Sequence, residues 1–206
     1  MTRFLALEIG IVAAAYLLGS VSFATLLVRT FHGLDVREAG SRNAGATNVL
    51  RTAGERLAFL TLLLDIAKGA VAVFVMSLLT ADPVWRGAAA IAAIVGHVFP
   101  VWFAFRGGKG VSTALGAFFL ICPWAALAGT AVFGVVVAAT RLVSLGSVTA
   151  ACLLPITMGL LFRARDAEVA AALVTTALLL ISHRRNIARL VQGTERRLGE
   201  TEKPGE

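Results

Sequence analysis

The chain has 206 residues, which is room for one domain or two small ones. Apolar residues make up 58% of it and charged residues 15%, whereas soluble domains have about 45–50% apolar and about 25% charged residues. This composition predicts an all-α integral membrane protein and argues against a soluble α/β enzyme, a nucleic-acid module or a disordered tail. The net charge of +7 then indicates cytoplasmic loops, because Lys and Arg gather on that side of membrane proteins.

A membrane-spanning helix needs about 20 mostly apolar residues. The stretches that meet or approach this length are, in chain order, 4–28, 57–79, 84–103, 111–140, 142–162 and 169–181. The first is not a signal peptide, because its apolar run continues far past Ala13-Ala14-Ala15. The last is short unless it extends from Asp166 to His183.

The stretch 111–140 holds Cys122-Pro123 in its middle and can be one helix or two. One helix gives six spans, and two helices that meet at Pro123 give seven. The seven-span arrangement puts 14 of the 19 Lys and Arg residues on one side. The positive-inside rule therefore favours about seven spans, some short or broken, with the N-terminus outside and the C-terminus cytoplasmic. We expect one polytopic domain over 1–206, with a flexible cytoplasmic tail from about 198 to 206.

In this arrangement the polar, glycine-rich segments face the cytoplasm. The first reads Gly40-Ser41-Arg42-Asn43-Ala44-Gly45-Ala46-Thr47-Asn48-Val49-Leu50-Arg51. Its small residues allow successive backbone N–H groups to form an anion-binding nest. Arg42 and Arg51 can add charge, since a guanidinium matches phosphate in a bidentate geometry. The alternative is a solvated loop that caps the next helix, with arginines present only for topology.

The second polar segment reads Gly107-Gly108-Lys109-Gly110-Val111-Ser112-Thr113 and begins an apolar helix. Free amides at a helix N-terminus, preceded by glycines and a lysine, favour an anion. The nucleotide-binding spacing G-x-x-x-x-G-K-[ST] is absent, so an ATPase is disfavoured. The alternative is a turn that needs glycine only for close packing.

Further polar residues lie at or within the predicted spans. His183 and Asn186, at the end of the last span, are three apart and share a helix face. Asp65 and Lys68 have the same spacing inside a span, where ionisable residues usually pair and are functional candidates. Asp65 and Lys68 can either form an ion pair that supports the site or contact the substrate directly, and the sequence leaves both alternatives open. His97 lies in the cytoplasmic half of its span.

The absence of certain motifs from the sequence also excludes some reaction types. It has no cluster with metal-ligand spacing and no His-x4-Asp acyltransferase signature. We therefore expect no metal and no cofactor, and substrates that bring their own activation.

Together these motifs resemble the bacterial acyl-phosphate:glycerol-3-phosphate acyltransferases, which are integral membrane enzymes of phospholipid synthesis. The resemblance covers nearly the whole chain, and it adds Tyr16-Leu17-Leu18-Gly19-Ser20, Ser144-Leu145-Gly146-Ser147 and Gly193-Thr194-Glu195 to the segments above. Two departures are visible. Arg42 stands where the family usually has glycine, and Ser22 stands where it usually has proline.

The resemblance implies transfer of a fatty acyl group from acyl phosphate to the sn-1 hydroxyl of glycerol 3-phosphate, which gives lysophosphatidic acid and phosphate. It implies that glycerol 3-phosphate is held by Arg51, Lys109, His183 and Asn186. Phosphate groups would be oriented by Ser41 and by Gly107, Gly108 and Gly110, with contacts from Ser144 and Ser147. We expect further substrate contacts from Asn43, Gly45, Thr47 and Asn48, and structural support from Asp65, Lys68 and Glu195.

The resemblance also places the protein in the bacterial cell membrane as a multi-pass enzyme with a cytoplasmic active site. No nucleic acid and no obligate protein partner is expected. The alternative from another class is a transporter or channel for phosphate-bearing anions, because broken helices with glycine-rich ends also fit transport. No inverted repeat between the halves is apparent, which counts against it.

Overall fold

The computed structural model describes residues 2–200, and every regular element within them is helical. The elements are α1 (Thr2–Gly19), α2 (Phe23–His32), α3 (Ala46–Ala53), α4 (Glu55–Leu79), α5 (Pro83–Val98), the 3-10 helix η1 (Val101–Phe103), α6 (Val111–Ile121), α7 (Pro123–Thr140), α8 (Val143–Ile156), the π-helix η2 (Thr157–Leu161), α9 (Asp166–Ser182) and α10 (Arg184–Val191).

The predicted all-α membrane fold is confirmed. Within the described part of the chain, five helical segments are long and apolar enough to cross a membrane. The pair α9 and α10, bent by 64°, makes a sixth if it counts as one span. The helix α9 begins at Asp166 and ends at Ser182, which gives the last predicted span the extra length it needed.

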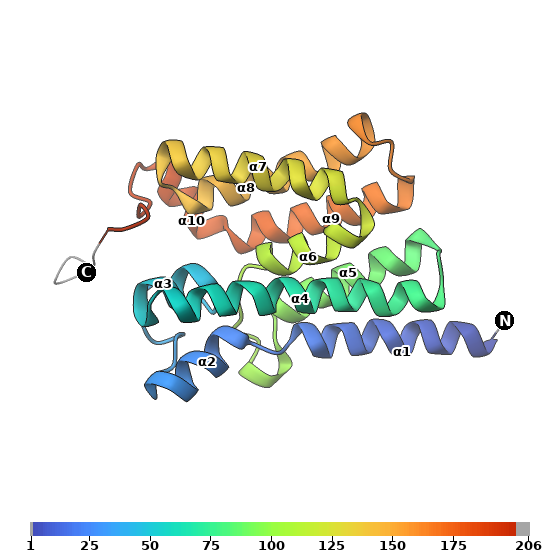
Figure 1. Ribbon diagram of the computed structural model, residues 1–206, viewed down its shortest axis with the longest axis horizontal. Helices are drawn as coiled ribbons and strands as arrows, with labels where there is room; N and C mark the ends of the chain where they lie inside the picture. The colour runs from blue at the N-terminus through green and yellow to red at the C-terminus, as the bar shows by residue number, and fades with distance from the viewer. Residues whose placement is uncertain (1, 201–206) are drawn as a thin grey trace.

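The long helices lie side by side along one axis (Figure 1). The helices α4 and α6, α1 and α5, and α7 and α8 pack against one another most extensively. The short helices α2, α3 and α10 and the turn between α7 and α8 lie together at the left of the view. We call this the site end of the bundle, because the polar segments between α2 and α3 and around α10 lie there, while the glycine loop before α6 lies nearer the middle of the view.

The first predicted span is not one continuous helix. It breaks at residues 20–22, where Ser22 is extended and its hydroxyl accepts a hydrogen bond from the backbone N–H of Thr25, capping α2. Serine is a preferred N-cap, and this contact is one that the family's proline cannot make. The break also exposes the carbonyl of Val21, which accepts a hydrogen bond of 2.8 Å from the ammonium of Lys68.

The long stretch 111–140 divides into α6 and α7, as the two-helix interpretation requires. Cys122 separates them because a residue before proline avoids the α region and proline has no N–H to continue the helix. The helix α6 has 11 residues and therefore rises only about 16 Å, against about 30 Å for the hydrocarbon core. The count of seven spans depends on α6 and stays a prediction.

Two glycines bring α6 into backbone contact with α4. A side-chain carbon at Gly116 would lie 1.9 Å from the carbonyl oxygen of Ile66, and one at Gly69 would lie 2.0 Å from that of Thr113. Small residues allow such close approach between membrane helices. The glycines therefore fix where the first turn of α6 lies relative to α4.

The opposite end of α6 is held by Arg86, from the first turn of α5. Its guanidinium donates a hydrogen bond of 2.7 Å to the carbonyl of Leu120. It also lies 3.5 Å from the buried carboxylate of Glu168, which Arg165 contacts at 2.6 Å. This cluster anchors the short helix at the end of the bundle opposite the site end.

Candidate active site

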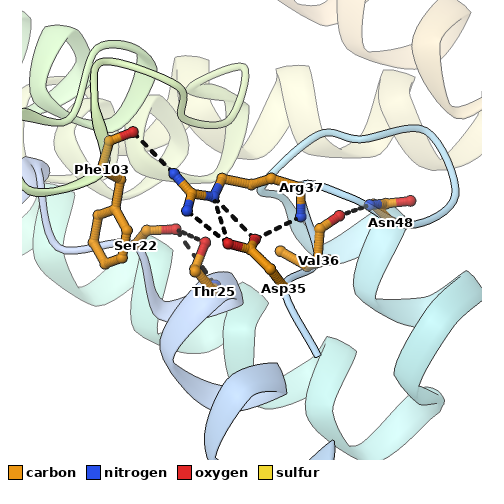
Figure 2. A network of polar contacts seen from close by, with 7 residues as sticks. All are labelled: Ser22, Thr25, Asp35, Val36, Arg37, Asn48 and Phe103. Carbon is orange, nitrogen blue, oxygen red and sulfur yellow. Dashed lines mark hydrogen bonds and ion pairs between the residues drawn. The ribbon is translucent and has the colours of Figure 1, made fainter. Parts of the chain in front are cut away.

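The segment between α2 and α3 folds around the side chain of Asn48, which is buried. Its amide donates hydrogen bonds to the carbonyls of Val36 (2.8 Å) and Ala39 (3.0 Å), and its oxygen accepts one of 2.8 Å from the N–H of Ser41. Figure 2 shows the bond to Val36. Both amide hydrogens are in use, so Asn48, predicted among the substrate ligands, is occupied in shaping this loop.

The other predicted residues of this loop remain accessible. Ser41 is exposed, and Asn43, Gly45 and Thr47 are half-buried. Gly45 is the N-cap of α3, and the first backbone N–H groups of a helix have no partner within the helix. The loop can therefore present backbone donors to an anion, as the sequence predicts.

Arg42 adopts a left-handed backbone conformation with φ of 58°. This conformation costs a residue with a β-carbon about 1–2 kcal/mol, a cost that glycine avoids. Glycine, which the resemblance leads us to expect at this position, would adopt the conformation without that cost. The Arg42 side chain is exposed.

Arg37 ties this loop to the segment that precedes the glycine loop (Figure 2). Its guanidinium pairs with Asp35 at 2.6 Å, donates a hydrogen bond of 2.9 Å to the carbonyl of Phe103, and lies over the Phe103 ring. The hydrogen bond from Arg37 lowers the pKa of the Asp35 carboxyl. Nothing in the sequence distinguishes Arg37 from the other loop cations.

The glycines of 107–110 are required for packing. A side-chain carbon at Gly108 would lie 2.1 Å from Nε2 of His97 and 2.7 Å from the carbonyl oxygen of Ala44, in the first loop. Gly110, the N-cap of α6, has φ of 89°. Close packing and anion binding, which the sequence left as alternatives, are compatible here because the same glycines bring the backbone of both loops together.

Lys109 is the charged residue of this glycine loop and is half-buried. Burial is the main cause that lowers its pKa to about 8; the charge of Glu195 opposes this shift, and the charges of Arg189 and Arg51 add to it. The ammonium therefore lies among other cations, in a place where a bound anion would relieve the repulsion.

His183 and Asn186 lie at the bend between α9 and α10, and both are buried. Nδ1 of His183 is 2.8 Å from the carbonyl oxygen of Leu179. A carbonyl can only accept, so Nδ1 carries the hydrogen, and Nε2 of the neutral ring is left as an acceptor. Asn186 donates a hydrogen bond of 2.6 Å to the Glu195 carboxylate. The two residues therefore lie near each other at the bend, and the shared helix face stays a prediction.

The segment 193–200 places Glu195 in the site. Arg189 also donates to its carboxylate, at 2.7 Å. Burial raises the pKa of Glu195, but the hydrogen bonds from Asn186 and Arg189 outweigh burial and hold the pKa below its ordinary value. The carboxylate is therefore charged and accepts hydrogen bonds from two side chains of α10.

The same segment is fastened to the turn between α7 and α8. The backbone N–H of Leu198 donates to the carbonyl of Arg141 (2.7 Å), and the guanidinium of Arg141 donates back to the carbonyl of Leu198 (2.6 Å). Residues 201–206 of the predicted flexible tail lie outside the described residues.

Side chains from separate segments of the chain converge at the site end. The Glu195 carboxylate interacts electrostatically with three cations, Arg51, Lys109 and Arg189. Lys109 also interacts electrostatically with the ring of His183. Ser144 and Ser147 are buried on α8, and Ser147 donates a hydrogen bond of 2.9 Å to the carbonyl of Val143. The convergence brings together the cations of three predicted segments.

Asp65 and Lys68 pair beneath the glycine loop. The ammonium lies 2.9 Å from the carboxylate, and each side chain is almost completely buried. The Asp65 carboxylate also lies 3.5 Å from Nδ1 of His97. The ion pair is thus part of the floor of the site.

Arg189 was missed by reasoning from the sequence. It lies three residues after Asn186 on α10, a spacing that places it on the same helix face. That signal was present, but Arg189 belongs to a run of basic residues that the positive-inside rule already explains.

Comparisons with known proteins connect this site to one family. A family model described as glycerol-3-phosphate acyltransferase matches residues 9–193. A glycerol-3-phosphate acyltransferase of Anaeromyxobacter sp. (strain Fw109-5) is 46% identical over 195 residues, which cover 91% of this chain and 95% of the relative. One of Thioalkalivibrio sulfidiphilus (strain HL-EbGR7) is 49% identical over 189 residues, which cover 92% of this chain and 93% of the relative.

Solved structures share the fold. The crystal structure of PlsY (YgiH), described as an integral membrane glycerol 3-phosphate acyltransferase in its glycerol 3-phosphate form, matches with a TM-score of 0.87 and 36% identity, over 93% of this chain and 96% of that one. Its lysophosphatidic acid form matches with a TM-score of 0.83 and 35% identity, over 93% and 95%. The chain therefore belongs to the family of integral membrane glycerol-3-phosphate acyltransferases.

Proposed function

We propose that this acyltransferase takes its acyl group from acyl phosphate and transfers it to the sn-1 hydroxyl of glycerol 3-phosphate at the cytoplasmic face. The observation that carries the proposal is the convergence of Arg51, Lys109 and Arg189 on two backbone loops rich in glycine. Such a site suits two phosphate-bearing substrates that would otherwise repel each other. The relatives are named acyltransferases, which gives no support to the transporter alternative.

Acyl phosphate is a mixed anhydride, so its leaving group needs no further activation. In the proposed step the sn-1 oxygen forms a bond to the acyl carbon, the bond from that carbon to the phosphate oxygen breaks, and inorganic phosphate leaves. The hydroxyl proton goes to Nε2 of His183 or to an oxygen of the acyl phosphate. Alignment and charge neutralisation then supply the rate enhancement.

The proposed residue roles are those that the family resemblance implies, and the positions of the residues support them. Lys109 and Arg51 hold the phosphate of glycerol 3-phosphate, while His183 and Asn186 line the same space from the bend of α9 and α10. The exposed Ser41 and the backbone of the two loops orient the second phosphate. Ser144 and Ser147 contribute from α8. Asp65, Lys68 and Glu195 support these groups from beneath and beside.

Donor use and metal independence can be tested together. Purified protein given glycerol 3-phosphate, palmitoyl phosphate and EDTA should release lysophosphatidic acid and phosphate in equal amounts. Among residues 2–200 no three His, Cys, Asp or Glu side chains are placed to hold a metal ion. Palmitoyl-CoA should give no product. Efficient turnover of palmitoyl-CoA would overturn the donor assignment, and activity lost to EDTA but restored by a divalent ion would reveal a metal site.

The cytoplasmic location of the site can be tested by cysteine labelling. Gln192 at the site end and Ala81 at the opposite end are both exposed and uncharged. In a variant without Cys122 and Cys152, an impermeant thiol reagent should label Ala81→Cys in intact cells. It should label Gln192→Cys only after the membrane is opened. Labelling of Gln192→Cys in intact cells would contradict the cytoplasmic site.

The pKa of Lys109 predicts a pH dependence of acceptor binding. Because that pKa is lowered to about 8, the ammonium is charged below this pH and loses its proton as the pH rises through it. The KM for glycerol 3-phosphate should therefore rise above pH 8, when measured by initial rates at saturating acyl phosphate. The Lys109→Ala variant should have a higher KM but lack this rise, since it has no ammonium to lose its proton. A KM that stays constant to pH 9.5 in the parent enzyme would contradict the assignment.

A further inference from the structure

His97 lies at the centre of a chain of polar groups that crosses the bundle beneath the glycine loop. Its Nδ1 is 3.1 Å from the hydroxyl of Thr113, in the first turn of α6, and 3.5 Å from the carboxylate of Asp65 on α4. Asp65 pairs with Lys68, which donates to the carbonyl of Val21 at the break between α1 and α2. These side chains are each at most 6% exposed.

The same histidine forms the underside of the glycine loop. Its carbonyl accepts a hydrogen bond of 3.0 Å from the backbone N–H of Gly108. A side-chain carbon at Gly107 would lie 2.1 Å from that carbonyl oxygen. On the other side, Nε2 of the ring leaves no room for a side chain at Gly108. The backbone of His97 therefore packs against Gly107 and Gly108, and its ring packs against Gly108.

We propose that His97 is a positioning residue for acyl transfer. Held by Asp65 and Thr113, it fixes the height and tilt of the 107–110 loop so that Lys109 and the loop amides meet the phosphate of glycerol 3-phosphate. The inference rests on the proposed role of Lys109 in binding this acceptor. His97 does not contact substrate in this arrangement, because the loop backbone covers it.

The burial of these polar side chains inside the helix bundle supports the proposed positioning role. Burying charged and polar side chains is costly, and a packed apolar floor would be the cheaper way to support a loop. A hydrogen-bonded floor has directional contacts, so it fixes the loop in one position. This series of polar side chains thus connects α4, the end of α5 and the start of α6 at the point where we propose that the phosphate binds.

The bond between His97 and Thr113 can be removed with little change of shape. Thr113→Val keeps the volume and loses the hydroxyl, while Thr113→Ser keeps the hydroxyl. Thr61→Val is the matched control, because Thr61 is equally buried on α4 and its hydroxyl has no hydrogen-bond partner. The readouts are the KM and kcat of acyl transfer, the Kd of glycerol 3-phosphate from calorimetry, and the melting temperature in detergent.

We expect Thr113→Val to raise both the KM and the Kd for glycerol 3-phosphate by about five- to tenfold, the effect of losing one buried hydrogen bond. Thr113→Ser should bind like the parent, and Thr61→Val should leave KM and Kd unchanged. In a His97→Ala background the further effect of Thr113→Val should vanish, because coupled residues are not additive. Equal effects of Thr61→Val and Thr113→Val, or additive effects of the two site changes, would overturn the proposal.

The calorimetric measurement separates this inference from the proposed donor. If the parent binds glycerol 3-phosphate but does not use acyl phosphate, the donor assignment fails, and the Kd values still decide the role of His97. If Lys109→Ala binds glycerol 3-phosphate as tightly as the parent, the role of Lys109 fails, and the positioning role falls with it.

Discussion

The variant Lys109→Ala is expected to lower kcat/KM by about 100- to 1,000-fold, the usual loss when one preorganised electrostatic group is removed from a transition state. Lys109 is the ammonium of the glycine loop, half-buried and surrounded by Arg51 and Arg189. Without it, two anionic substrates meet with less positive charge between them, and Arg51 and the loop amides are left to hold the phosphate. Initial rates with purified variant and parent measure the effect.

Arg106→Ala is the matched control, because Arg106 precedes the same glycines and its side chain is exposed. It removes the same charge from the loop, yet exposed charges are largely screened by salt, so kcat/KM should change by less than about threefold. Lys109→Arg should recover little activity, since a broad guanidinium does not fit where a compact ammonium fits. Near-normal turnover of folded Lys109→Ala would remove Lys109 from the site.

The variant Gly116→Ala is expected to destabilise the fold by about 1–3 kcal/mol, as overpacking of a tight interface does. The added carbon would lie 1.9 Å from the backbone oxygen of Ile66, and a backbone atom in a long helix cannot move aside cheaply. The helix α6 must shift away from α4, and the glycine loop at its start moves with it. Both the melting temperature in detergent and the acyltransferase activity should fall.

The control for this variant is Gly134→Ala on α7, where an added carbon would meet no atom within 4 Å. Alanine favours the helix over glycine by about 1 kcal/mol, so this change should leave the protein as stable or more stable. A Gly116→Ala protein with the melting temperature and activity of the parent would show that the two helices are not in backbone contact.

Features of the fold that depend on local sequence were predictable. Apolar stretches located the long helices, and Pro123 located the break between α6 and α7, because proline acts on its own neighbours. The break after α1 was not predicted. It depends on the cap that Ser22 makes with Thr25, and apolar residues on both sides hide such a break from a hydropathy pattern.

The same distinction holds for the site. The two segments proposed to bind phosphate could be recognised because glycines and cations are adjacent in the sequence. The roles of Asn48 and Arg37 depend on partners that the loop brings together only when folded, namely Val36, Ala39 and Phe103. The contact between His97 and Thr113 joins two helices, and neither residue alone carries a signal of it.

The short length of α6 sets how far along the bundle the glycine loop lies. Its last turn is tied to Arg86 at the end opposite the site end, and its 11 residues rise only about 16 Å from there. The glycine loop therefore lies near the level of Asp65, while Phe59 of α4 lies further toward the site end and is 62% exposed. In the proposed reaction, glycerol 3-phosphate would have to pass this exposed apolar side chain to meet the loop. The proposed acyl donor could then keep its chain beside the apolar helices while its phosphate reaches the loop.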